Sequence, residues 1–101
     1  MTSHEEYSEA ANVSDTFAAV AGHLVADASG ELVLLHQQTG AYFGLNATGK
    51  RIWELIQSPR SVPELVSRIT TEFDVPERAA TDDILNVLSR LVDEGLASRS
   101  G

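Results

Sequence analysis

The sequence predicts an α+β domain in which a three-stranded antiparallel sheet is followed by three helices, in a winged-helix-like arrangement. Short apolar runs separated by turn signals fill residues 16–45, whereas apolar residues at helical spacing dominate residues 46–94. The last two helices are separated by a short break, as in a helix-turn-helix, and the preceding hairpin resembles its wing. With 101 residues, the chain can bury one modest core. We expect a flexible, polar and acidic tail over residues 1–15 and one folded domain over residues 16–98.

The three expected strands are short and joined by tight turns. Apolar content rises over residues 16–25, which suits one strand. The turn signal Ala28-Ser29-Gly30 leads into a buried strand over residues 31–37. Gln38-Thr39-Gly40 then supplies a second turn, in which glycine can adopt a positive φ, and residues 41–45 return as the third strand. Such hairpin loops imply an antiparallel meander.

The three expected helices carry start and stop signals. Asn46 or Thr48 can cap the first, and Ser61 with Glu64 forms a capping box for the second. Gly95 suits the left-handed position that ends the third. The expected apolar faces, in chain order, are Ile52, Trp53, Leu55 and Ile56; Val62, Leu65, Val66, Ile69 and Phe73; and Ala80, Ile84, Val87, Leu88 and Leu91, with Leu96 folding back onto the core.

Composition excludes several classes of partner. Fifteen carboxylates against seven Lys and Arg give a net charge of -8, which repels phosphate backbones and anionic lipids. We therefore expect neither a nucleic acid nor a membrane as partner, but a neutral, basic or amphipathic peptide or another protein. The chain has no cysteine, no signal-peptide pattern at its start and no apolar run of about 18 residues. These features predict a soluble cytoplasmic protein.

No catalytic constellation is apparent in the sequence. His4, His23 and His36 are dispersed without cysteine partners, so no metal site is expected. No serine sits in a nucleophile turn, and the glycines before the first helix lack the Lys-Ser/Thr of a phosphate loop. We expect no catalytic residues, no metal, no cofactor and no enzyme activity.

The junction of the third strand with the first helix indicates a groove. An aromatic strand ends at Leu45-Asn46 and a helix begins at once, which leaves the strand beside a helix-lined hollow. A three-stranded sheet leaves at least one edge with unpaired N–H and C=O groups, which an added peptide strand can satisfy. Tyr42 and Phe43 point to opposite faces of the strand, so one of them can wall the groove.

The third helix could supply the opposite wall from either flank. On one flank Asp83 and Arg90 are candidate polar selectors, and the other flank carries Leu85 and Ser89. Helical spacing alone leaves both flanks open. The first flank comprises Asp83, Asn86, Val87 and Arg90.

Three motifs follow one another at fixed spacing: Gly40-x-Tyr42-x-Gly44-Leu45-Asn46-x-x-Gly49-x-x-Ile52-Trp53, then Ser61-Val62-x-Glu64-Leu65, then Asp83-Ile84-x-x-Val87-Leu88-x-x-Leu91-x-x-x-Gly95-Leu96. They resemble those of the PqqD family, the leader-peptide recognition modules of ribosomally made, post-translationally modified peptides (RiPPs). The resemblance covers about residues 24–97, and its specificity comes from the order and spacing of the motifs. The Thr-Gly before the third strand and the Ile-Trp of the first helix are closer to the stand-alone modules of lasso-peptide pathways than to the pyrroloquinoline quinone (PQQ) pathway protein.

The resemblance implies recognition and not catalysis. It implies that a precursor's leader segment adds as a strand along the third strand, with apolar side chains entering a groove against the third helix. The implied partners are the leader peptide together with a leader protease or macrocyclase, or a radical enzyme if the module serves the PQQ pathway. The implied peptide-binding residues are Ala41, Tyr42, Phe43, Gly44, Asp83, Asn86, Val87 and Arg90.

Two alternative functions share this architecture. One is a peptide chaperone of the PQQ pathway. The other is a winged-helix regulator that binds nucleic acid, which would need Lys and Arg on the recognition helix. Residues 81–94 carry four carboxylates against Arg90 alone, so this helix would repel phosphates.

Overall fold

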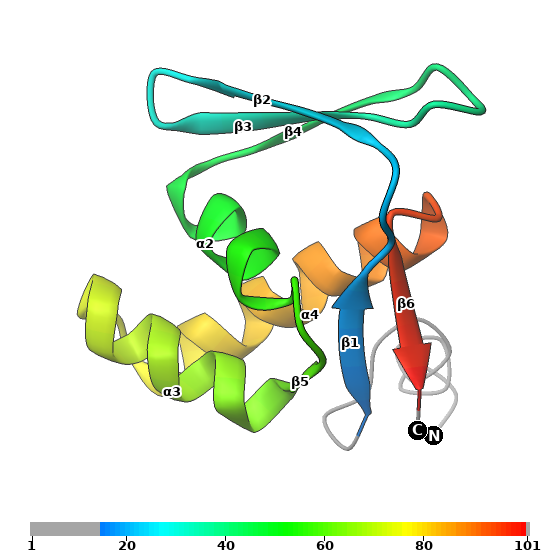
Figure 1. The fold of residues 1–101 in the computed structure, drawn as a ribbon. Coiled ribbons are helices and arrows are strands. Elements are labelled where there is room, and N and C mark those ends of the chain that lie inside the picture. Colours follow the sequence, from blue (N-terminus) through cyan, green and yellow to red (C-terminus); the bar gives the residue numbers. More distant parts are fainter. Residues whose placement is uncertain (1–14, 101) are drawn as a thin grey trace.

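The computed structural model describes residues 15–100 and confirms the α+β fold class. The expected tail, apart from its last residue, lies outside the described residues. In Figure 1 one sheet lies across the top of the molecule and the helices lie beneath it. The elements are β1 (Thr16–Ala19), β2 (Leu24–Ala28), β3 (Glu31–Leu35), β4 (Tyr42–Leu45), α2 (Ala47–Leu55), β5 (Arg60–Ser61), α3 (Val62–Phe73), α4 (Glu77–Asp93) and β6 (Ala97–Ser100).

The sheet at the top of Figure 1 is the expected antiparallel meander, in the order β2-β3-β4. Ser29 and Gly30 both have positive φ (54° and 84°), as a two-residue hairpin turn requires. Gly40 in the second turn has φ 75°. Inward-facing Leu32 and Leu34 are buried against the helices, so one face of this sheet covers the core.

The prediction of a single strand over residues 16–25 is wrong. This segment forms β1 and β2, which belong to different sheets, because the chain turns between them at Gly22, where φ is 98°. The second sheet has the order β5-β1-β6, and β1 and β6 lie side by side in Figure 1. Phe17 of β1 is fully buried, so this second sheet closes the core on another side.

The predicted helix signals are observed in α2, α3 and α4. The Asn46 side chain caps α2 by accepting a bond from the Gly49 N–H at 2.9 Å. Ser61 and Glu64 form the capping box of α3. Most of the expected apolar residues are buried, but Val87 is only half-buried and packs at the margin of the core. Val87 is therefore available to a surface groove.

The end of α4 follows the expected left-handed cap. Gly95 has φ 75°, and the Leu96 N–H donates to the Leu91 carbonyl at 2.8 Å. Leu96 is buried, as predicted. The chain then continues as β6 to Ser100, past the expected domain end at residue 98.

Candidate functional site

Among residues 15–100, β3 alone pairs with β4, so β4 is an edge of its sheet in the described part of the chain. The His36 N–H donates to the Ala41 carbonyl at 3.0 Å, which fixes the phase of the antiparallel ladder. Alternation from this pair directs the main-chain groups of Phe43 and Leu45 toward β3. It directs the N–H and C=O groups of Tyr42 and Gly44 away from the sheet. The free edge therefore offers two donors and two acceptors to an added strand.

The side chains of β4 alternate between the two faces of the sheet. Tyr42 faces outward and is 75% exposed, whereas Phe43 is half-buried on the helix side. Gly44 pairs in register with Val33, so the strand contains no bulge there. A Cβ added at Gly44 would meet no atom within 4 Å. Internal packing therefore does not require glycine at position 44.

A groove of about 360 Å³ separates the end of β4 from α4. Below, it is called the β4–α4 groove. The Arg90 guanidinium lies 4.6 Å from the centroid of the Phe43 ring, a cation–π contact that ties the two walls together. The groove is lined by Glu31, Gly44, Leu45, Asn46, Val87 and Arg90.

The structure decides which flank of α4 faces this groove. Leu85 is buried in the core and the Ser89 hydroxyl is enclosed, so the protein itself covers that flank. Val87 and Arg90 lie on the open flank and line the groove.

Five residues of the predicted set are outside the groove lining, although one of them, Phe43, contacts the lining residue Arg90; the five are Ala41, Tyr42, Phe43, Asp83 and Asn86. Asp83 and Asn86 are exposed on α4 and do not line the groove. Ala41 lies just before β4, and its main-chain groups are already bonded to His36 and to the Thr39 hydroxyl. The structure therefore brings together Phe43, Gly44, Val87 and Arg90 from the predicted set and adds Glu31, Leu45 and Asn46.

The junction after β4 is fixed by a close approach at Gly49. A Cβ at Gly49 would lie 3.1 Å from two side-chain carbons of Leu45, so only glycine packs there without displacing Leu45. Together with the Asn46 cap, this contact sets the angle at which α2 leaves β4. The sequence motif at this junction is therefore explained by packing.

The turn before β4 is organised by a buried histidine. The His36 Nδ1 accepts bonds from the N–H groups of Gln38 and Thr39 at 3.2 and 3.3 Å. The His23 ring packs against it at a tilt of 41°, with ring centroids 4.3 Å apart, and the His23 Nδ1 accepts a bond from the Gln37 N–H. Sequence reasoning considered these histidines only as metal ligands and missed this role. Within residues 15–100, no group of three His, Cys, Asp or Glu side chains gathers as a metal site.

Ion pairs hold α2 against the neighbouring elements. The Arg51 guanidinium makes two contacts with Glu72 of α3, at 2.7 and 3.1 Å, and these hydrogen bonds lower the pKa of the Glu72 carboxyl. Lys50 bonds to Asp27 of β2 at 2.6 Å, and this hydrogen bond raises the pKa of the Lys50 ammonium. These pairs brace the strand-bearing and helical parts of the domain, away from the free edge of β4.

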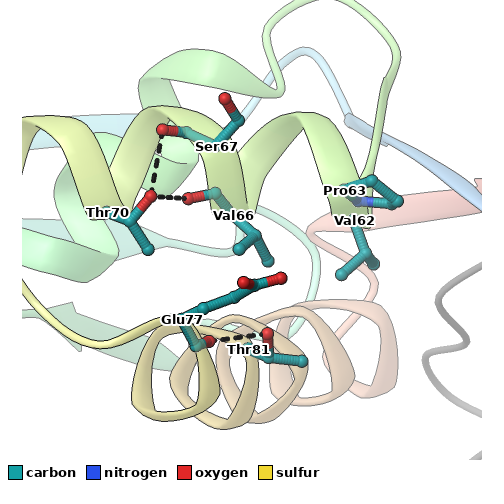
Figure 2. Close-up of a pocket in the computed structure, with 7 residues that line it drawn as sticks. All are labelled: Val62, Pro63, Val66, Ser67, Thr70, Glu77 and Thr81. Atoms are coloured by element: carbon teal, nitrogen blue, oxygen red, sulfur yellow. Dashed lines mark hydrogen bonds between the residues drawn. The ribbon is translucent and has the colours of Figure 1, made fainter.

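A second groove, of about 420 Å³, lies between α3 and α4, and sequence reasoning did not identify it. Below, it is called the α3–α4 groove. Figure 2 shows the Glu77 carboxylate directed between the two helices, while the Thr70 and Thr81 hydroxyls bond back to main-chain carbonyls. It is lined by Val62, Pro63, Val66, Ser67, Thr70, Glu77 and Thr81.

Among the described residues, no helix has the length and apolar character needed to cross a membrane.

A winged-helix-like α+β domain with an open strand edge beside its last helix is the class of protein that these elements define. A family model described as coenzyme PQQ synthesis protein D (PqqD) matches residues 31–97, and the chain belongs to this family. No curated protein matches the chain.

Three solved structures are similar to this chain. TbiB1 in complex with the TbiA(beta) leader peptide is 34% identical, with a TM-score of 0.70, covering 80% of this chain and 94% of that one. A lasso peptide synthetase B1 complexed with the leader peptide is 27% identical, with a TM-score of 0.69 and coverage of 81% and 96%. The PqqD truncation of Methylobacterium extorquens PqqCD, a stand-alone RiPP recognition element, is 20% identical and shares the fold, with a TM-score of 0.74 and coverage of 89% and 96%.

Proposed function

We propose that this protein binds the leader segment of a ribosomally made precursor peptide by strand addition to β4. The single observation that carries the proposal is the free edge of β4, with the main-chain groups of Tyr42 and Gly44 directed outward beside the β4–α4 groove. Two similar structures, at 34% and 27% identity, contain leader peptides, which supports the same ligand class here.

The energetics suit an adaptor that binds reversibly. Four main-chain hydrogen bonds at about 0.5–1.5 kcal/mol each give a modest affinity that any extended peptide could share. Sequence specificity must then come from side chains. Every second leader side chain would point toward α4, into the groove that Val87 and Arg90 line. The others would lie beside exposed Tyr42 on the outer face.

The further role is delivery of the bound precursor to processing enzymes, namely a leader protease and a macrocyclase in a lasso-peptide pathway. The higher identity to the leader-bound lasso peptide synthetase B1 (27%) than to the PqqD structure (20%) favours the lasso pathway over the PQQ pathway. Delivery would take place in the cytoplasm, where a ribosomally made precursor first appears. The protein's own contribution is binding and presentation, with the chemistry performed by its partners.

A direct test is titration of a fluorescent leader peptide, taken from the precursor gene adjacent to this gene, with the purified protein. We expect saturable binding with a micromolar or lower dissociation constant. Tyr42→Ala is expected to weaken it, because the exposed ring covers the outward leader side chains. If no leader from the protein's own locus binds above background, the proposed function is wrong.

A further inference from the structure

The chain's cations are mostly engaged by its own carboxylates. Lys50, Arg51, Arg68 and Arg99 each lie within 4.0 Å of an Asp or Glu oxygen. In contrast, no carboxylate of residues 15–100 lies within 4.0 Å of the Arg90 guanidinium. Arg60 and Arg78 likewise have no carboxylate within 4.0 Å among residues 15–100, so what distinguishes Arg90 is its position in the groove beside the free strand edge.

The position of Arg90 is set by an aromatic ring. The guanidinium carbon lies 4.6 Å over the Phe43 ring centroid, so the ring face holds the cation at the mouth of the β4–α4 groove. A guanidinium stacked in this way keeps its edge N–H groups free to bind a carboxylate in the bidentate geometry that arginine favours. Arg90 is therefore held in place and retains its donors.

Strand addition places one leader side chain in front of this cation. A residue opposite Phe43 shares its face of the sheet and points toward α4. The Arg90 guanidinium, stacked on the Phe43 ring, therefore lies beside this leader side chain and can bind a carboxylate that it carries.

We propose that Arg90 is a specificity-determining residue, which selects leader peptides carrying an Asp or Glu at the position opposite Phe43. This proposal rests on the proposed function, since it requires strand addition to β4. Its substrate class is an extended peptide with one carboxylate fixed toward α4. The overall charge of -8 favours a leader that is neutral or basic elsewhere.

The test is selection of a displayed library of random peptides on the full chain. We expect wild-type protein to enrich peptides with Asp or Glu at one fixed position. Arg90→Gln should lower that enrichment about tenfold, the loss expected for a charge-assisted hydrogen bond, while keeping the other preferences. Arg90→Lys should restore part of it, and Arg90→Glu should change the preference to Lys or Arg. Arg78→Gln, another α4 arginine outside this groove, is the matched control.

The outcomes separate this proposal from the proposed function. Unchanged enrichment of acidic residues by Arg90→Gln would overturn the selector role and leave strand addition intact. Loss of every preference by Arg90→Gln, at an unchanged melting temperature, would also overturn it, because a selector governs one position. If wild-type protein enriches no peptide, and the adjacent precursor's leader does not bind either, the proposed function itself is wrong.

Discussion

The α3–α4 groove and the β4–α4 groove differ more in the main-chain groups of their walls than in their volume. The α3–α4 groove is the larger of the two, at about 420 Å³, but both of its walls are helices, which offer no strand edge to an extended peptide. The β4–α4 groove encloses about 360 Å³, and one wall is a strand with an unpaired edge. An extended peptide gains main-chain hydrogen bonds only in the second groove.

The two grooves also differ in charge. Glu77 points into the α3–α4 groove, whereas Arg90 lines the β4–α4 groove together with Glu31. Volume therefore indicates where a side chain fits, and free main-chain groups indicate where an extended chain fits. The predictions below test whether this distinction decides where a leader binds.

The largest effect is expected from Gly44→Pro. Proline removes an outward N–H and places its ring at the free edge, so the affinity for the leader should fall by at least about tenfold. The ladder with β3 should persist, because an outward N–H makes no bond within the sheet and edge strands tolerate proline. Isothermal titration with the adjacent precursor's leader measures the change.

Two variants control for the proline effect. Gly44→Ala keeps the N–H, and its Cβ meets nothing within 4 Å, so any loss of affinity should be far smaller. Val25→Pro makes the equivalent change on the β2 edge, where the ladder also directs the N–H outward. Equal loss with Val25→Pro would mean that the β4 edge is not the specific binding edge.

The next effect is expected at the turn that supports β4. His36→Ala removes the acceptor of two main-chain N–H groups in a buried setting, so the free energy of unfolding should fall by about 1–3 kcal/mol. Urea denaturation measures it. His23→Ala, whose bond to Gln37 is exposed, should cost less. If both variants cost the same, the turn depends on the ring contact and not on the His36 acceptor.

The sequence predicted the elements whose signals are local. The capping box at Ser61, the turn at Gly40 and the cap at Gly95 each depend on residues within a few positions, and all three are observed. The order of strands followed the turn signals for the same reason. The strand near residue 20 was mispredicted because apolar content continues through Gly22, although the chain turns there.

The features that depend on distant pairings could not be predicted. Polar β6 becomes a strand only because β1 lies beside it, and the tilted ring contact of His23 with His36 joins the residue before β2 to the residue after β3. For the candidate site, helical spacing left two flanks of α4 as possible walls of the groove. Burial of Leu85 then excluded one flank, which is a tertiary fact.

A smaller, pH-dependent effect is expected on the side of the domain away from β4. Arg51 lowers the pKa of Glu72 below the usual 4.5, so the ionised carboxylate stabilises the folded state above about that pH. This stabilisation is lost as the pH falls through the lowered pKa. Glu72→Gln should therefore reduce the melting temperature slightly at neutral pH and progressively less in acid, without changing leader affinity.

Calorimetry at a series of pH values measures the difference in melting temperature between wild type and Glu72→Gln. Glu54→Gln removes a single contact with Arg51, at 3.2 Å, and should cost less than loss of the double contact from Glu72. A difference between wild type and Glu72→Gln that grows in acid would contradict the assignment, because a protonated Glu72 cannot pair with Arg51.

The smallest effect is expected from filling the larger groove. Ser67 lies on the exposed side of α3 and lines the α3–α4 groove, so Ser67→Tyr should fill part of that groove without disturbing the core. If free main-chain groups decide where the leader binds, the affinity of Ser67→Tyr for the leader should differ from that of the wild type by less than about twofold, as for an ordinary surface substitution. Weakening as large as that of Gly44→Pro would instead place the leader between α3 and α4, and volume would then outweigh the open strand edge.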